Sequence, residues 1–149
     1  MLRGDISNRE SPIIAFNIDT LLFKHEQKKD SLKDKFIGVF GSEKSKAFNR
    51  VIDDVFVNNL LYLWHNFNYS IYLVTYNSDY ISEYEKLLAD KDICYTRLVD
   101  FSTEDLDGLR RFVANRCTLY FDSDLVRLST ISNTKAVEYR NLWTYMRRK

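Results

Sequence analysis

The sequence predicts an α/β fold with a mainly parallel central sheet that is covered by helices on both faces. Short apolar runs alternate along the chain with longer helical patterns, which is typical of parallel sheets. The 149 residues, 45% of them hydrophobic and 29% charged, suffice for one domain with its own core. We therefore expect a three-layer α/β/α sandwich over residues 1–149, with no linker dividing it.

The first half of the chain begins with a buried strand, predicted at 13–17, directly after Pro12. The stretch 22–41 is dense in charge and poor in large apolar residues, so it reads as a small charged cap-like insertion. A long helix is predicted at 43–66, because its apolar residues recur at steps of three and four. Ser42 is a suitable N-cap for that helix.

The second half of the chain continues the alternation of strands and helices. Further strands are predicted at 71–75, 93–98, 117–121 and 136–138. Helices are predicted between and after them, at 78–89, 102–115, 125–131 and from about residue 140 onward. Right-handed crossovers would bring the carboxyl ends of the parallel strands to one edge of the sheet.

The composition narrows the classes of function. A net charge of +1, with both signs spread along the chain, argues against nucleic acid and anionic membranes as partners. No window approaches about 18 consecutive apolar residues, and the N-terminus lacks a secretory pattern, so we expect a cytoplasmic protein without a membrane span. Cys94 and Cys117 lie in short apolar stretches and are expected to be reduced.

The most informative stretch is the end of the first predicted strand. There, two short polar side chains, Asn17 and Asp19, follow an apolar run at a spacing of two residues. Alternate residues of an extended strand project to the same side, so both side chains can reach one small volume. Open α/β sheets bind their ligands at this edge, which makes the two residues candidates for a functional site.

Two further predicted strands end in polar residues as well. The second strand ends in Thr75, with Asn77 two residues later, and the fourth is followed by Asp122 and Asp124. If the strands are neighbours, all three polar clusters surround one pocket. Hard oxygen ligands of this kind suit Mg²⁺ together with a substrate phosphate.

The order of these clusters resembles the haloacid dehalogenase-like phosphohydrolases, whose first motif reads Asp-x-Asp-x-Thr/Val. The resemblance covers the chain from about residue 12 to about residue 138. It implies an acid/base role for Asp19 and an Mg²⁺ site made by Asp19, Asp122 and Asp124. It also implies phosphate binding by Thr75, Asn77 and a basic residue, for which Arg97 is best placed by position, with Arg110 and Arg111 behind it.

The first acid of the family motif, its nucleophile, is Asn17 in this chain. An amide oxygen is a poor nucleophile and carries no charge to attract Mg²⁺. Loss of a covalent nucleophile usually costs several orders of magnitude in rate. Three interpretations stay open: an engineered substitution that traps a ligand, a native asparagine in a binding or regulatory protein, or a turn residue in a chain that shares only the fold.

Two hypotheses of function follow from these residues. The first is Mg²⁺-dependent hydrolysis of a small phosphomonoester, with nucleotides among the candidates, at a site that Asn17 leaves weakly active or inactive. The second is a catalytically silent protein that acts through a protein or nucleotide partner. Near the C-terminus, Tyr139, Trp143 and Tyr145 either dock on the core or form an apolar patch for a homodimer.

Overall fold

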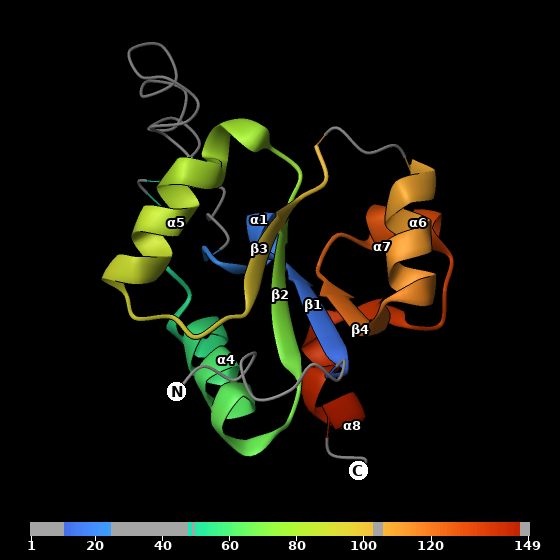
Figure 1. Cartoon of the computed structure of the whole chain (residues 1–149), viewed down its shortest axis with the longest axis horizontal. Coiled ribbons are helices and arrows are strands. Elements are labelled where there is room, and N and C mark those ends of the chain that lie inside the picture. The colour runs from blue at the N-terminus through green and yellow to red at the C-terminus, as the bar shows by residue number, and fades with distance from the viewer. Residues whose placement is uncertain (1–10, 25–47, 49, 103–105, 147–149) are drawn as a thin grey trace, which may run out of the picture.

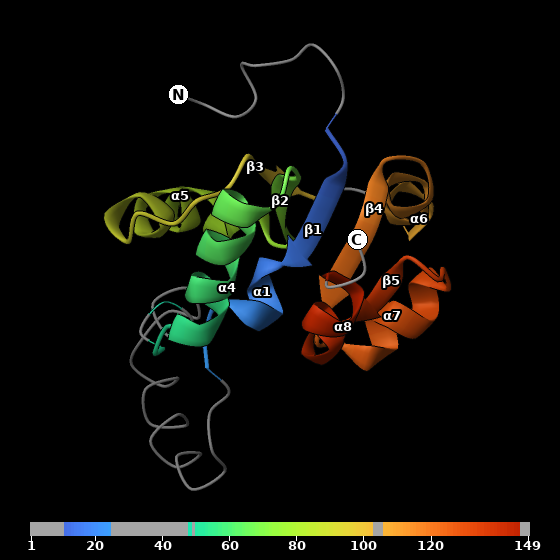
Figure 2. The ribbon, with the colours of Figure 1, turned by 90° about the horizontal axis from the view of Figure 1, so that it is seen from below.

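The sheet of this protein has all its described strands parallel, in the order β3-β2-β1-β4-β5 (Figure 1). The structure is a computed structural model that describes residues 11–24, 48, 50–102 and 106–146. Within those residues five strands pair: β1 (Ile13–Asn17), β2 (Ser70–Thr75), β3 (Arg97–Asp100), β4 (Cys117–Asp122) and β5 (Ala136–Glu138). The first strand therefore lies at the centre, between β2 and β4 (Figure 2).

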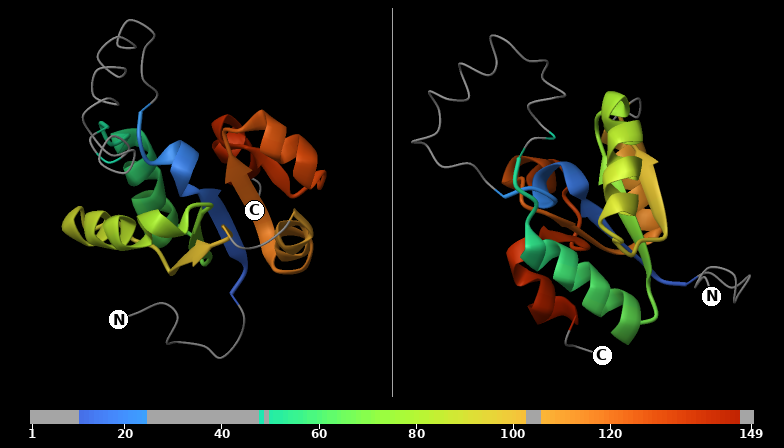
Figure 3. Two further views of the ribbon diagram at one scale, coloured as in Figure 1. Left: turned by 90° about the horizontal axis from the view of Figure 1, so that it is seen from above. Right: turned by 90° about the vertical axis from the view of Figure 1, so that its left-hand side faces the viewer.

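Helices connect the strands along the chain. The described α-helices are α1 (Ile18–Leu21), α4 (Asp54–Asn66), α5 (Ile81–Asp90), α6 (Leu106–Asn115), α7 (Leu125–Ile131) and α8 (Leu142–Met146). Two 3₁₀ turns, η3 (Ser78–Tyr80) and η4 (Tyr139–Asn141), lead into α5 and α8. Helices α4 and α8 lie side by side (Figure 3), and the rings of Tyr62 and Trp143 meet between them with centroids 5.4 Å apart.

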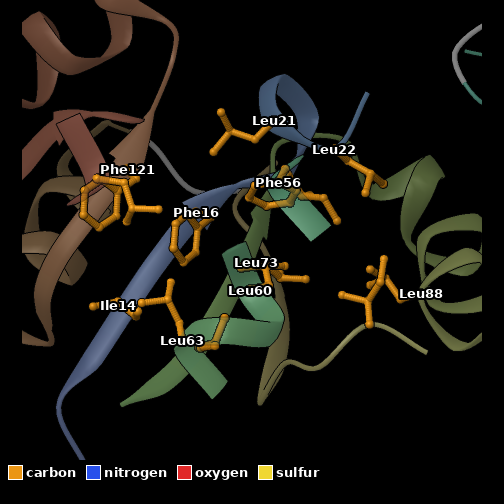
Figure 4. Close-up of a cluster of buried hydrophobic side chains, with 14 of the residues drawn as sticks. Ile14, Phe16, Leu21, Leu22, Phe56, Leu60, Leu63, Leu73, Leu88 and Phe121 are labelled. Atoms are coloured by element: carbon orange, nitrogen blue, oxygen red, sulfur yellow. The ribbon is translucent and has the colours of Figure 1, made fainter. Parts of the chain in front are cut away.

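Two clusters of buried side chains form the core, and β1 contributes to both. Its alternate residues Ile14 and Phe16 belong to the first cluster, with side chains from α4, α5 and α8 (Figure 4). Ile13 and Ala15 belong to the second, with side chains from α6 and α7. Since alternate residues of a strand face opposite sides of a sheet, the two clusters cover opposite faces.

Several predicted elements are confirmed to within about one residue. They are the strands predicted at 13–17, 71–75, 117–121 and 136–138 and the helix predicted at 125–131. The predicted insertion at 22–41 falls almost wholly outside the described residues, as does Ser42. Within the part of the chain that is described, no helix has the length and apolar character needed to cross a membrane.

The long helix predicted at 43–66 is confirmed from Asp54 onward and is wrong at 50–53, which are not helical; Phe48 is helical, and 43–47 and 49 lie outside the described residues. Just before α4, Ile52 forms an antiparallel bridge with Phe23 instead of continuing a helix. Asp53 then caps α4, and its carboxylate accepts hydrogen bonds from two backbone N–H groups of the first turn. The apolar residues Val51 and Ile52, which fit the helical spacing, therefore lie in a non-helical segment.

The third strand is also displaced: it was predicted at 93–98 and is observed at Arg97–Asp100. The residues in front of it end α5 instead. Asp92 takes a left-handed conformation with φ of 52°, and the N–H of Ile93 then donates to the carbonyl of Leu88 at 3.0 Å. This C-terminal turn buries Ile93, whose apolar side chain made the segment resemble a strand.

Candidate functional site

The carboxyl ends of β1, β2 and β4 lie next to one another at one edge of the sheet, which we call the rim (Figure 2). Among the described residues, the polar side chains that are fully buried are Asn17, Thr75 and Asp122, one from each of these strands. Burying a polar group is costly unless it is hydrogen-bonded. Their shared position shows that the rim is where the fold gathers such groups.

Asn17 uses both ends of its amide. Its Nδ2 donates to Oδ2 of Asp122 at 2.9 Å, and its Oδ1 accepts from the backbone N–H of Asp19 at 3.0 Å. The reversed amide would set its oxygen against the carboxylate and its NH₂ against an N–H group, so both contacts would become repulsive. The hydrogen bonds therefore define one orientation of Asn17.

Asp122 accepts four hydrogen bonds, which fill the acceptor sites of its carboxylate. Its Oδ2 receives the Asn17 amide and the hydroxyl of Tyr120 at 2.7 Å. Its Oδ1 receives the hydroxyl of Thr20 at 3.0 Å and the backbone N–H of Asp124 at 2.9 Å. A carboxylate surrounded in this way can stay buried without a further ligand.

Asp19 is held by donors from β2 and α5. Its Oδ1 accepts from the hydroxyls of Thr75 and Tyr84, each at 2.7 Å. Its Oδ2 accepts from the backbone N–H of Tyr76 at 2.8 Å. The three donors form a cradle of the kind that binds an anion, and the Asp19 carboxylate occupies it.

Buried tyrosines stay protonated and donate hydrogen bonds to these carboxylates. Burial raises the pKa of Tyr84 above its ordinary value, and the neighbouring charge of Asp19 raises it further. Burial likewise raises the pKa of Tyr120, with added contributions from Tyr76 and Asp122. Because Tyr120 gives its single proton to Asp122, the 2.9 Å contact between the two hydroxyls makes Tyr76 the donor to Tyr120.

Arg127, in the first turn of α7, is a basic residue at the rim. Its Nε lies 3.7 Å from Oδ2 of Asp122 and 3.9 Å from Oδ2 of Asp124. Its guanidinium carbon lies 3.7 Å from the centre of the Tyr76 ring, a cation–π contact. The arginine therefore offsets part of the negative charge at the rim.

We call the set joined by these contacts the rim network: Asn17, Asp19, Thr20, Thr75, Tyr76, Tyr84, Tyr120, Asp122, Asp124 and Arg127. Two of the three carboxylates expected to hold Mg²⁺, those of Asp19 and Asp122, already accept hydrogen bonds from protein donors through both oxygens. Asn17 also presents NH₂ rather than oxygen to Asp122. Within the described ranges, no three His, Cys, Asp or Glu side chains are grouped to hold a metal ion.

No protein-family model, curated protein or solved structure matches this chain. The resemblance to the haloacid dehalogenase-like phosphohydrolases therefore depends on the sequence motifs. Of the predicted site residues, Asn17, Asp19, Thr75 and Asp122 are brought together at this rim by direct hydrogen bonds or through a shared partner.

Two other predicted site residues, Asn77 near the rim and Asp124 within the rim network, work as helix caps. Asn77 accepts from the backbone N–H of Asp79 at 3.1 Å and so begins η3. Asp124 accepts from the backbone N–H groups of Val126 and Arg127 and so begins α7. Both contacts are of the ordinary capping kind.

Arg97, the predicted phosphate ligand, lies away from the rim. It begins β3 and pairs in register with Tyr72, whereas Asp100 at the other end of the strand pairs with Thr75. Arg97 therefore lies three residues, or about 10 Å along the strand, from the end of the sheet at which Thr75 lies. Arg110 also points elsewhere and donates to the carbonyl of Thr130.

The members of the rim network that were not among the predicted site residues are Thr20, Tyr76, Tyr84, Tyr120 and Arg127. A sequence signal existed for Arg127, because it follows Asp124 by three residues in a helix that starts directly after the fourth strand. Tyr84 and Tyr120 occupy positions that read as apolar core. Only the tertiary structure shows that their hydroxyls reach carboxylates.

Proposed function

We propose that this chain is a catalytically silent domain related to the haloacid dehalogenase-like phosphohydrolases, which acts by binding a partner. The central position of β1 and the core clusters on both faces support the finer description of a three-layer α/β/α sandwich. The single observation that carries the proposal is the hydrogen bond from Asn17 to Asp122. If residue 17 were an aspartate, as in the family motif, two carboxylates would face each other at this point.

The contacts of Asp19 support the absence of turnover. A general acid must donate a proton to the leaving group, but both carboxylate oxygens of Asp19 act as acceptors. The amide oxygen of Asn17 is turned toward the N–H of Asp19 and is a poor nucleophile in any case. Neither side chain is therefore set for the role that the resemblance implies.

The charge at the rim also disfavours a phosphate there. Among the described residues, the carboxylates of Asp122 and Asp124 lie beside the guanidinium of Arg127, and the Asp19 carboxylate is held by uncharged donors. A phosphate would have to displace the Asp19 carboxylate from its cradle and then meet two further negative charges. We infer that the partner, a nucleotide or a protein, binds at another surface.

A second candidate function is retained because of one observation: Asp19 and Thr75 meet at 2.7 Å beside Asp122, as a phosphohydrolase site would require. Under this candidate the domain hydrolyses a small phosphomonoester with Mg²⁺ once residue 17 is an aspartate. The two candidates differ in what the Asn17→Asp variant does.

The test is to assay the full chain and its Asn17→Asp variant with p-nitrophenyl phosphate, in Mg²⁺ and in EDTA. We expect no hydrolysis above the buffer rate from either protein. We also expect the variant to be less stable by about 2 kcal/mol in EDTA, because a second carboxylate replaces the donor to Asp122. Asn58→Asp, at an exposed position of α4, is the charge-matched control and should change stability little.

Mg²⁺-dependent hydrolysis by Asn17→Asp, abolished again in Asn17→Asp/Asp19→Asn, would favour the second candidate. Hydrolysis by the unaltered chain, lost on Asp19→Asn, would overturn the proposal. Urea unfolding in Mg²⁺ and in EDTA separates loss of folding from loss of activity.

A further inference from the structure

A groove of about 510 Å³ lies between β3 and α6. It exists because β3 is the edge strand of the sheet, while α6 packs against β4 nearer the centre. We call it the arginine groove, since its walls carry three arginines and three aromatic rings: Arg97, Arg111, Arg116, Tyr72, Phe101 and Phe112. None of these residues belongs to the rim network.

The arginines of this groove are exposed and lie on two elements: Arg97 begins β3, Arg111 is on α6, and Arg116 follows it. Among the described residues, no acidic side chain lines the groove, and these three guanidinium groups form no ion pair with an acid. Arg110 on the same helix differs, because it pairs with Asp107 and binds a backbone carbonyl. Three like charges around one hollow attract an anion.

Aromatic residues line the groove beside these charges, and we call the three rings the aromatic wall. The rings of Tyr72 and Phe112 are stacked, with centroids 6.2 Å apart and planes inclined by 26°. Phe101 lies next to Phe112, with centroids 5.0 Å apart and planes inclined by 53°. Both phenylalanine rings are largely buried, so Tyr72 is the most accessible of the three. Aromatic side chains stack with nucleobases, and the arginine fork matches the oxygens of a phosphate.

We propose that the arginine groove binds a nucleoside phosphate, with the base against the aromatic wall and the phosphate beside the arginines. The groove volume lies within the range of about 300–1,000 Å³ typical of small-molecule sites. A peptide adding to the sheet would pair along the outer edge of β3, whereas the groove lies on the face toward α6. The net charge of +1 argues against an extended nucleic acid.

This proposal rests on the proposed function in one respect, since it names a ligand for the binding role. The two can still fail separately. The hydrolysis assay on Asn17→Asp tests the rim, while the experiment below tests the groove and has no catalytic readout.

The experiment titrates the full chain with AMP, adenosine and inorganic phosphate, by calorimetry and by ¹H–¹⁵N NMR. We expect AMP to shift amides of β3 and α6, and adenosine and phosphate each to bind at least about tenfold more weakly than AMP. Arg97→Gln/Arg111→Gln should weaken AMP binding at least about tenfold. Arg140→Gln, which removes an exposed arginine from η4, is the matched control and should stay within about twofold.

Tyr72→Leu tests the aromatic wall, because it should weaken AMP binding while leaving phosphate binding unchanged. Arg127→Gln tests the rim, and loss of AMP binding in that variant alone would place the ligand there and overturn both proposals. Equal affinity for AMP and phosphate, or no binding of AMP, would overturn the nucleotide assignment. So would an oligonucleotide that binds far more tightly than AMP through the same arginines.

Discussion

The rim network and the arginine groove differ in how their charges are matched. At the rim, the carboxylates of Asp19 and Asp122 together accept seven hydrogen bonds from protein groups, three and four respectively. In the groove, three exposed guanidinium groups surround a hollow with no acidic side chain among its described lining residues. The first region is complete in the protein alone, and the second acquires its counter-charge from a ligand.

This difference teaches that convergence of polar residues does not by itself mark a working site. The rim gathers the residue types of a phosphohydrolase, yet its acceptors are saturated by donors of the same chain. Saturation of this kind stabilises a fold and lowers the gain from any ligand. Unmatched charge beside an exposed cavity is the better indication of binding.

The largest effect that separates the two regions should come from Asp122→Ala. The substitution leaves the donors of Asn17, Thr20 and Tyr120 without their buried acceptor. We expect the free energy of unfolding, measured with urea, to fall by about 3–5 kcal/mol.

Asp124→Ala is the control for that experiment, since it removes a neighbouring carboxylate that caps α7. It should cost only about 1 kcal/mol. Equal losses in the two variants would show that the hydrogen bonds accepted by Asp122 matter no more than a helix cap.

A second effect should appear at alkaline pH. Burial raises the pKa of Tyr76 to about 12 and raises that of Tyr84 as well. Above pH 10 the unfolded chain loses the tyrosine protons that the folded chain keeps, so this stability is present below pH 10 and is lost as the pH rises. Each such tyrosine should contribute a slope of up to about 1.4 kcal/mol per pH unit.

Urea unfolding of the unaltered chain and of Tyr84→Phe at several pH values from 9 to about 12 measures that slope. The variant should show a flatter decline because one raised group is gone. Tyr145→Phe, at an exposed position of α8, serves as the comparison and should decline as the unaltered chain does. Parallel curves for all three proteins would contradict the role given to Tyr84.

The smallest effect is expected in the groove. Arg97→Gln/Arg111→Gln should change the free energy of unfolding by no more than about 0.5 kcal/mol, because exposed side chains without a special contact contribute little. Circular dichroism during thermal unfolding measures this change. A loss as large as that of Asp122→Ala would show that these arginines support the fold, and the contrast between the two regions would then disappear.

Much of the fold could be predicted because the apolar patterns and helix caps in the sequence agree with the way the strands and helices pack. The apolar runs at 13–17 and 117–121 became neighbouring central strands, and the order of the polar clusters placed Asn17 and Asp122 together. Asp124 as an N-cap was readable from its position before a helical pattern. These features depend on periodicity and capping, which a sequence records directly.

The rest depended on contacts between distant segments. The predicted helix is interrupted just before Asp54 because Ile52 pairs with Phe23, which lies far back in the chain. The predicted phosphate ligand Arg97 was misplaced because the third strand begins four residues later than its apolar pattern indicated. Likewise, Tyr84 donates to Asp19 because of the way α5 packs, and its position within the helix gave no sign of this contact.

The carboxylate that fills the cradle of Thr75, Tyr76 and Tyr84 has a further consequence. A ligand that binds only the native state raises stability in proportion to the logarithm of its concentration. Here the anion is the Asp19 carboxylate, which is part of the chain, so its concentration near the cradle is fixed. The stability of this region should therefore not depend on the concentration of free phosphate.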